Sequence, residues 1–567
     1  MQKTILFLSL LCFLWCPPAL AQGEGSAAPV PAASDLVVER QFGAVGDPGS
    51  FRAKFSKAGG GLWFLQLTDH FQTLESAARR PHLPGDYLLL AFNGSDHALR
   101  LVGEPADTRF PAGLEKELWN YAEIENGVQF TLASGNGLEL VKTLRHDPTQ
   151  RGFVFELTLR NLSADPGGRC VFQLLGPALV NPAEATLIGN SSVAIAAPVE
   201  GDAKHVVPAA GKVQTLEVDP TRLSFAGNTN RFFGTFLYPR DEADSKALTG
   251  LFVDTVPPRD DLDSNTHANT ATRLRYGMAL VVPERLAETK VSFGLYFGPK
   301  SYSTFATLAQ PERFAPILDV DLTTQCCVEV PGGRQMAKLL LWLLSWFHGA
   351  VGNWGVAIIM LTILVRGLLA PLNFRMQKSM RAYSARMGVL KPKLDALKER
   401  HADDPKAYQQ AMIAFQREHK MIPPIGGCAP IFLTMPIYIG LFTALRTAYD
   451  LRQQPFTLWM NDLSRADELF ALPFWPHYFN LLPLVWIGLF LWMQLRMPLP
   501  TDPQQRQMQS MMRYMPILFG LMLYGYASAL MVYMVTSMVW SLFESAVTKR
   551  ILGPIDPNVA AMTPTPM

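Results

Sequence analysis

The chain has 567 residues, of which 49% are hydrophobic and 17% charged, and its formal net charge is +2. It is too long for a single domain and too apolar for an ordinary soluble protein, and its near-neutral charge gives no electrostatic argument for a nucleic-acid partner. Six cysteines in this length exclude a scaffold held together by disulfides.

The first 22 residues are typical of an export signal. Lys3 precedes an apolar stretch, Ile5–Cys16, and Ala19-Leu20-Ala21 forms a small-x-small cleavage site. The alternative is an uncleaved first transmembrane span at 1–22, because the uncharged stretch continues past Pro17. Both interpretations export the chain that follows. Residues 23–34 are rich in Gly, Ala and Pro and are expected to form a flexible leader.

Residues 35–330 are predicted to form a large antiparallel β-domain. Phe153–Arg160 alternates apolar and polar residues with the two-residue period of a strand, and Val291–Phe297 does the same. Asn136-Gly137 lies between two further stretches of this kind and predicts a hairpin turn. Helical patterns are not regularly interleaved with these strands, which favours a β-sandwich over a parallel sheet.

The physical character of the chain changes at Met336. Leu339–Phe347 is continuously apolar, but at about 1.5 Å per residue it reaches only about 14 Å, less than half of a bilayer core. We therefore expect residues 335–350 to form a lateral helix that lies along the membrane interface.

Longer apolar stretches are predicted to cross the membrane as helices at 352–373, 425–446 and 478–496. Tyr514–Phe543 carries no charge and would be about 45 Å long as one helix, beyond the roughly 30 Å of a hydrocarbon core. Basic residues flank it on both sides, so the positive-inside rule predicts a hairpin that turns near Tyr526–Ala529. Its two arms are assigned to 513–527 and 529–548, which are short enough to imply a locally thinned bilayer.

The charges of the loops predict the orientation of the chain. Residues 375–423 carry eleven Lys and Arg, whereas 447–477 carry two, so the first loop is expected in the cytoplasm and the second in the periplasm. The first loop has helical spacing on both sides of Asp403-Asp404-Pro405 and is predicted to be a helical hairpin. The loop 497–512 and the tail 549–567 are expected in the cytoplasm as well.

Arg366 lies within the span at 352–373 and is the first candidate for a functional residue. A guanidinium near the middle of a transmembrane helix costs about 2.5–3.5 kcal/mol on insertion scales, so it requires a hydrated cavity or a partner. Thr362 lies one turn away on the same helix face. Polar residues of the other spans could complete a hydrated pocket, namely Thr434, Gln494, Thr536 and Ser537. The alternative is that Arg366 only extends its side chain to the nearer lipid headgroups.

The sequence also argues against several function classes. It contains no G-x-x-x-x-G-K-[ST] phosphate loop, no H-E-x-x-H and no paired C-x-x-C, so we expect no nucleotide, no metal, no other cofactor and no enzymatic activity. An alternative is a transporter or channel whose exported sandwich binds a carbohydrate-like ligand. Such a protein is expected to carry ionisable residues on several spans and to show repeated halves, and neither feature is visible.

Several motifs resemble the bacterial YidC-type membrane protein insertases of the YidC/Oxa/Albino family. The second span of that family is similar to Gly352-Asn353-Trp354-Gly355 followed by 361–367 (LTILVRG), and the third span to Ile425-Gly426-Gly427-Cys428 followed by Met435-Pro436-Ile437. The short outer loop is similar to 451–456 (LRQQPF). The resemblance is dense over about 335–550. The chain departs from the family at the last span, where only Tyr533, followed by Met534, stands in place of two tandem tyrosines.

The resemblance implies a multi-domain membrane protein. An exported all-β supersandwich would be followed by the lateral helix and by a five-helix transmembrane α-helical core with a cytoplasmic helical hairpin. The core would enclose a hydrophilic groove that is open to the cytoplasm and to lipid but sealed toward the periplasm. Arg366 stands at the position of the family's groove arginine, and Tyr533 and Met534 would contact clients there.

The implied activity is insertion and folding of nascent client membrane proteins in the bacterial inner membrane, alone or with the Sec translocon. The protein would be multi-pass, with a large periplasmic domain and a cytoplasmic C-terminus. The lipid bilayer is a further partner, and the basic hairpin at 375–423 could contact the ribosome or a targeting receptor. The alternative for this hairpin is that it only obeys the positive-inside rule.

Overall fold

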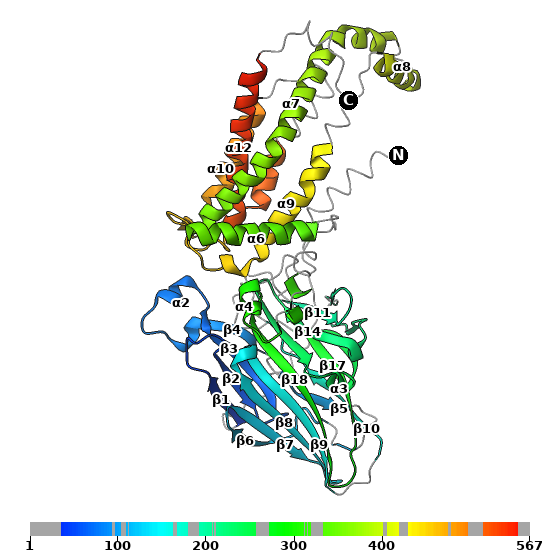
Figure 1. Ribbon diagram of the computed structural model, residues 1–567, viewed down its shortest axis with the longest axis vertical. Helices are drawn as coiled ribbons and strands as arrows, with labels where there is room; N and C mark the ends of the chain where they lie inside the picture. Colours follow the sequence, from blue (N-terminus) through cyan, green and yellow to red (C-terminus); the bar gives the residue numbers. More distant parts are fainter. Residues whose placement is uncertain are drawn as a thin grey trace. The chain divides into compact units, whose positions relative to one another are not determined.

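The structure is a computed structural model (Figure 1), and it describes residues 36–92, 97–103, 109–110, 113–162, 167–179, 192–206, 208, 211–256, 271–310, 312–314, 316–318, 333–400, 405–418, 429–473, 478–496 and 514–553. The chain divides into two compact parts, Met1–Val37 and Val38–Met567, and all described elements after the first residue of β1 belong to the second part. The export signal expected at 1–22, the leader 23–34, the loop 497–512 and the tail beyond residue 553 lie outside the described residues.

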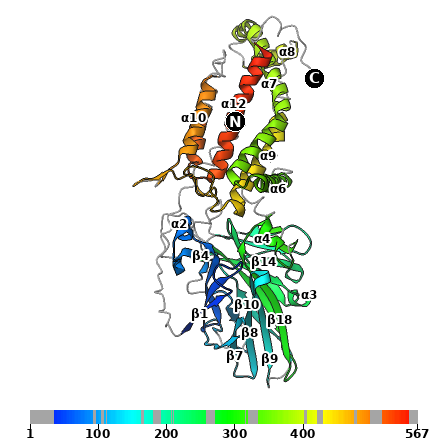
Figure 2. The ribbon, with the colours of Figure 1, turned by 60° about the vertical axis from the view of Figure 1, so that its left-hand side comes forward.

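Three β-sheets account for most of the described chain up to Pro299 (Figures 1 and 2). The four-stranded sheet has the order β1 (Val37–Phe42), β2 (Phe51–Ser56), β3 (Gly61–Phe71) and β4 (Tyr87–Phe92). The five-stranded sheet has the order β13 (Gln214–Thr215), β16 (Leu248–Val256), β17 (Ala271–Val281), β10 (Arg169–Leu175) and β5 (Leu101–Gly103). The nine-stranded sheet has the order β12 (Lys204–Val206), β11 (Val193–Pro198), β14 (Leu223–Thr229), β15 (Phe233–Pro239), β18 (Glu288–Pro299), β9 (Gly152–Asn161), β8 (Leu138–Asp147), β7 (Gly127–Ala133) and β6 (Asn120–Ile124).

The alternation predicted for β9 is confirmed and shows how the sheets share a core. Phe153, Phe155 and Leu157 are fully buried, as one face of a strand that packs on a neighbouring sheet should be. A single buried cluster joins side chains of all three sheets. Within it the rings of Phe51 and Phe153 meet edge to face with centroids 4.9 Å apart, a favoured arrangement for aromatic pairs. The β-region is therefore a stack of sheets around a common apolar interior.

The hairpin predicted at Asn136-Gly137 is also present. Strands β7 and β8 pair antiparallel, with Ala133 opposite Glu139. Gly137 has a φ of 85°, in the left-handed region that glycine adopts without steric cost. The amide of Ser134 donates to the carbonyl of Leu138 over 2.7 Å, which closes the turn.

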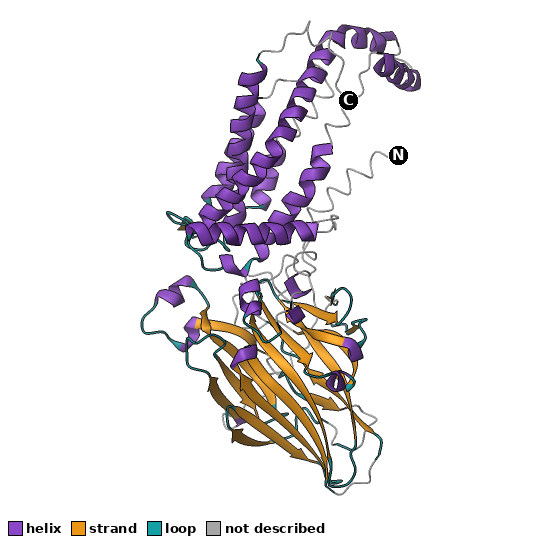
Figure 3. Cartoon of the chain, in the orientation of Figure 1, coloured by secondary structure: helices purple, strands orange, loops and turns teal. Residues whose placement is uncertain are grey.

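The described chain after Pro299 is mostly helical (Figure 3). Its longer helices are α6 (Gly333–Val351), α7 (Trp354–Arg400), α8 (Pro405–Glu418), α9 (Ala429–Thr447), α10 (Leu481–Leu495) and α12 (Ser528–Leu552), together with residues 514–522. Two helical segments among the described residues are long and apolar enough to cross a membrane, Trp354–Ser379 and Ser528–Leu552, and α10 is a shorter apolar helix. A short two-stranded sheet, β19 (Phe470–Ala471) and β20 (Tyr478–Phe479), precedes α10.

Helix α7 differs from the sequence interpretation, which separated a span at 352–373 from a helical hairpin beginning at 375. The structure has one helix of 47 residues that contains both Pro371 and Pro392. The change from apolar to basic side chains after Leu372 suggested a boundary, but the backbone hydrogen bonds of a helix do not depend on side-chain polarity. The apolar and the basic stretch therefore form one continuous element, and only α8 turns back.

The spans assigned near the C-terminal end also differ in detail. The interval 478–496 begins with β20 rather than with helix, since α10 starts at Leu481. The hairpin arm assigned to 529–548 corresponds to the longer α12, which continues past the uncharged stretch to Leu552. Residues 514–522 are helical and precede turns at 523–525. The hairpin bend at this place is thus formed by residues 523–527.

A two-residue joint connects α6 to α7. Gly352, with a φ of 67°, donates its amide to the carbonyl of His348 over 2.7 Å and ends α6, as glycines in this conformation commonly do. Asn353 then accepts the amide of Val356 at 3.1 Å, which caps the first turn of α7. Its amide group donates to the carbonyl of Phe456 over 3.0 Å. The Gly-Asn pair therefore orients both helices and anchors them to the loop after α9.

Helix α6 carries apolar residues on two faces. Leu340 and Leu344 are buried in the cluster that contains Ile358 of α7 and Leu441 of α9. A second row at helical spacing is largely exposed and consists of Leu339, Trp342 and Trp346. Exposed rows of large apolar side chains commonly mark a surface that contacts lipid or a partner.

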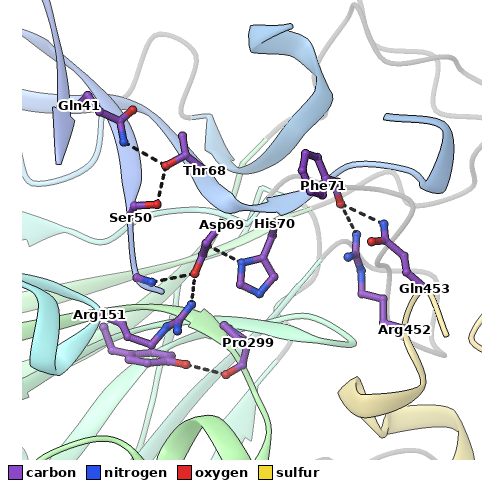
Figure 4. A network of polar contacts seen from close by, with 12 residues as sticks. Gln41, Ser50, Thr68, Asp69, His70, Phe71, Arg151, Pro299, Arg452 and Gln453 are labelled. Atoms are coloured by element: carbon purple, nitrogen blue, oxygen red, sulfur yellow. Dashed lines mark hydrogen bonds and ion pairs between the residues drawn. The ribbon is translucent and has the colours of Figure 1, made fainter. Parts of the chain in front are cut away.

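A polar network in β3 links the β-region to the loop after α9 (Figure 4). The Asp69 carboxylate pairs with His70 at 2.5 Å and with Arg151. Burial raises the pKa of Asp69, but the hydrogen bond and charge of His70 and the charge of Arg151 outweigh it, so the pKa lies below its ordinary value.

Next to this pair, the carbonyl of Phe71 accepts hydrogen bonds from Arg452 at 3.0 Å and from Gln453 at 3.1 Å. Arg231 of the β-region also donates hydrogen bonds to the carbonyls of Arg446 and Ser464.

Candidate functional site

Arg366 belongs to α7, and Figures 1 and 2 both show that α7 and α12 run side by side. Its Nε donates to Oγ of Ser537 over 2.7 Å, and its Nη2 donates to the same oxygen. Ser537 is 4% exposed, whereas Arg366 is half-buried. The sequence nominated both residues, and the structure brings them into direct contact.

An aromatic ring from a third helix completes the surroundings of this guanidinium. The ring of Tyr438 in α9 has its centroid 5.3 Å from Cζ of Arg366, within the range of a cation–π contact. The rings of Tyr438 and Tyr533 lie 6.2 Å apart. Arg366, which belongs to α7, therefore contacts residues of both α9 and α12.

The contacts of Arg366 leave its charge available. A guanidinium has five N–H donors, and the hydrogen bonds described use Nε and Nη2 toward a single hydroxyl oxygen. Among the described residues no carboxylate forms an ion pair with Arg366. A hydroxyl and an aromatic face stabilise a cation without neutralising it, so this group can still attract an anion.

A second polar contact joins the same two helices. Asn373 of α7 donates its side-chain N–H to Oε2 of Glu544 in α12 over 3.4 Å. Each of these residues follows its counterpart in the first contact by seven positions, so α7 and α12 run parallel. Seven residues correspond to about 10 Å of helical rise. Oε1 of Glu544 and Nε1 of Trp540 are buried and have no hydrogen-bond partner among the described residues.

The remaining predicted site residues take several positions. Thr362 is 1% exposed and donates its hydroxyl to the carbonyl of Ile358 in its own helix over 2.7 Å. Gln494 is buried on α10, which packs against α12, and no hydrogen bond joins it to Arg366 in the described part of the chain. Met534 packs at the border of two apolar clusters, and Thr536 is half-buried. The side chain of Thr434 lies outside the described residues.

Sequence reasoning missed three residues of this site, namely Tyr438, Asn373 and Glu544. Helical spacing could have found two of them, because Asn373 lies on the face of Arg366, two turns further along, and Glu544 is related to Ser537 in the same way. The pairing itself had no signal in the sequence, since the partners in each contact lie 171 positions apart.

A family model described as "60Kd inner membrane protein" matches residues 346–554. A Neisseria meningitidis serogroup C protein named Membrane protein insertase YidC is 30% identical over 414 residues, which cover 70% of this chain and 67% of that protein. An Aeromonas hydrophila subsp. hydrophila protein of the same name is 37% identical over 265 residues, which cover 47% of this chain and 43% of that protein. The match thus spans less than half of the Aeromonas protein.

Among solved structures, an active YidC insertase with its first transmembrane domain resolved aligns with 87% of this chain and 90% of its own chain. The sequence identity is 14% and the TM-score is 0.33.

Proposed function

Because this chain belongs to the YidC family of membrane protein insertases, we propose that it inserts and folds client membrane proteins in the bacterial inner membrane through a hydrophilic groove that contains Arg366. The proposed activity is non-enzymatic, and the clients are nascent membrane proteins. The protein would act alone or with the Sec translocon, with the ribosome or a targeting receptor as further partners of residues 375–423.

The observation that carries this proposal is a cation held among apolar helices, with no carboxylate paired to it in the part of the chain that the structure describes. Arg366 contacts Ser537 and the ring of Tyr438, while Leu368 and Phe543 on the same helices are exposed apolar residues. Apolar outer faces suit contact with lipid, and a charge inside a membrane is retained only where a cavity or partner compensates its cost. An anionic or polar tail of a client would be drawn to Arg366, while the apolar segment of the client leaves toward the lipid.

The proposed orientation follows from the loop charges. The basic stretch at 375–423 would lie in the cytoplasm with the C-terminus, and the β-region would lie in the periplasm. The groove would comprise Arg366 and Ser537, with Thr362, Thr434, Gln494, Tyr533, Met534 and Thr536 as further lining residues, and the complete core would have five transmembrane helices. The exposed row of α6 would lie against the bilayer interface.

The test uses the full-length protein in proteoliposomes with a single-span client that has an acidic translocated tail. Arg366→Ala should reduce insertion about tenfold or more, because it removes the charge that attracts the tail inside a low-dielectric site. Arg375→Ala removes a charge from an exposed position of the same helix and should retain nearly full insertion. Equal insertion by the Arg366→Ala variant and the unmodified protein would remove Arg366 from the mechanism.

A further inference from the structure

We propose that Glu544 binds a basic side chain of the client, so that the groove recognises two opposite charges in a fixed order. This inference rests on the proposed function and names a residue that would set client specificity. The ligand is the ammonium or guanidinium group that borders the apolar segment of a client. Arg366 would bind the anionic side of the same client, about two turns earlier on α7.

Glu544 and Arg366 lie at successive places along the same pair of helices. The contacts Arg366–Ser537 and Asn373–Glu544 join the same pair of parallel helices, one about 10 Å beyond the other. The first contact holds a cationic group and the second an anionic group. A client segment that lies along α7 and α12 therefore passes both, with its polar groups separated by about two helical turns.

The Glu544 carboxylate has unused hydrogen-bonding capacity. Asn373 occupies only Oε2 of Glu544, whereas Oε1 is buried without a partner among the described residues. A buried carboxylate oxygen that lacks a hydrogen bond is costly. A hydrogen-bond donor from a client would therefore satisfy Oε1 of Glu544. Trp540 lies one turn before Glu544 on α12, and indole faces attract cations. A carboxylate with an indole on the same helix face suits a Lys or Arg side chain.

The basic end of α12 gives the two charged groups a direction relative to the membrane. Lys549 and Arg550 follow Glu544 near the end of α12, which the positive-inside rule places in the cytoplasm. The same rule keeps the basic flank of a client on that side. The cation-binding group thus lies toward the end where a basic flank is retained, and Arg366 lies toward the side that an acidic tail must reach. The order of charges in the groove matches the orientation of such a client.

The test compares two forms of one single-span client in proteoliposomes that contain the full-length protein. The forms differ only in the residue at the retained flank, which is Lys in one and Gln in the other. The unmodified protein should insert the Lys form at least about threefold better, since a charge-assisted contact in a membrane site exceeds a neutral one. Glu544→Gln should abolish this preference, so that the Lys form inserts no better than the Gln form.

A charge exchange and a matched control complete the design. Glu544→Lys should favour a third form of the client that carries Glu at the flank. Glu399→Gln changes the charge at an exposed position of α7 and should keep the original preference for Lys. A preference that persists in Glu544→Gln overturns the inference, and so does an equal loss for both client forms, because that result assigns Glu544 a structural role.

The same assay separates this inference from the proposed function. Vesicles with the unmodified protein that insert no more client than empty vesicles would overturn the proposed function. Insertion that depends on Arg366 but shows no flank preference would overturn only the role of Glu544.

Discussion

Asp69 shows how a single buried carboxylate connects two neighbouring segments of the β-region. It accepts the amide of Gly49 at 2.8 Å and pairs with His70 and Arg151, while the ring of His70 lies 5.9 Å from that of Tyr449. Because these partners favour the ionised form, the pKa of Asp69 lies below its ordinary value despite burial. A group of this kind stabilises the folded state while it is ionised and loses that contribution once it is protonated.

We therefore expect Asp69→Asn to lower the free energy of unfolding at pH 7 by about 1–3 kcal/mol. The lowered pKa means that the contribution of Asp69 is complete above its unfolded-state pKa of about 3.9 and disappears as the pH falls through the folded-state value. The difference between variant and parent should thus shrink below pH 4 or so. Thermal unfolding of the full chain in detergent at several pH values measures it, and a difference independent of pH would contradict the assignment.

At the scale of elements, close packing of α7 depends on one glycine. A Cβ added to Gly355 would lie 2.0 Å from Cδ2 of Phe456, so the helix start and the loop that follows α9 touch through the missing side chain. Asn353 fixes the same contact with its hydrogen bond to the carbonyl of Phe456. The motif 352–355 is thus explained by helix termination, capping and close approach.

Gly355→Ala is expected to lower the stability of the helical region by about 1–3 kcal/mol, because either α7 or the Phe456 ring must move. Gly367→Ala on the same helix is the matched control, since its added Cβ meets no atom within 4 Å. That control should be neutral or more stable by up to about 1 kcal/mol through helix propensity. Equal melting temperatures for the two variants would show that Phe456 does not restrict this position.

The individual elements were more predictable than their pairing. The alternation in β9 and the glycine turn before β8 are local patterns, and each has one simple backbone solution. The continuity of α7 is not visible in the sequence, because the change from apolar to basic residues resembles a structural boundary. Arg366 and Ser537 were nominated because polar groups inside apolar stretches are conspicuous. Tyr438 is not conspicuous in the sequence, because aromatic residues are common in apolar helices.

At the scale of the whole molecule, hydrogen bonds to main-chain carbonyls link the β-region to the loop after α9. Arg231 donates to the carbonyl of Arg446 at 2.8 Å and to that of Ser464 at 3.0 Å. The same loop holds the start of α12, because the amides of Ser528 and Ala529 donate to the carbonyls of Arg465 and Leu463. A continuous set of contacts thus leads from the β-region to the helix that carries Ser537.

Arg231→Ala should increase backbone amide exchange across 446–465 and at the first turn of α12, because two anchors of this loop are lost. Arg222→Ala is the control, since Arg222 is an exposed β-region residue paired with exposed Glu200, and exposed pairs contribute little. Hydrogen exchange of the full chain measures both variants. Identical exchange in both would show that the loop holds its conformation without the β-region.

The parallel register of α7 and α12 has one further mechanical consequence. Arg366 and Asn373 meet partners that are offset by the same 171 positions, so sliding one helix along the other would rupture both links at once. Separating the two helices sideways from one end breaks the two contacts one after the other. Each step therefore meets a smaller barrier than the simultaneous loss of both. Any opening between α7 and α12 should therefore begin at one of these two contacts and spread toward the other.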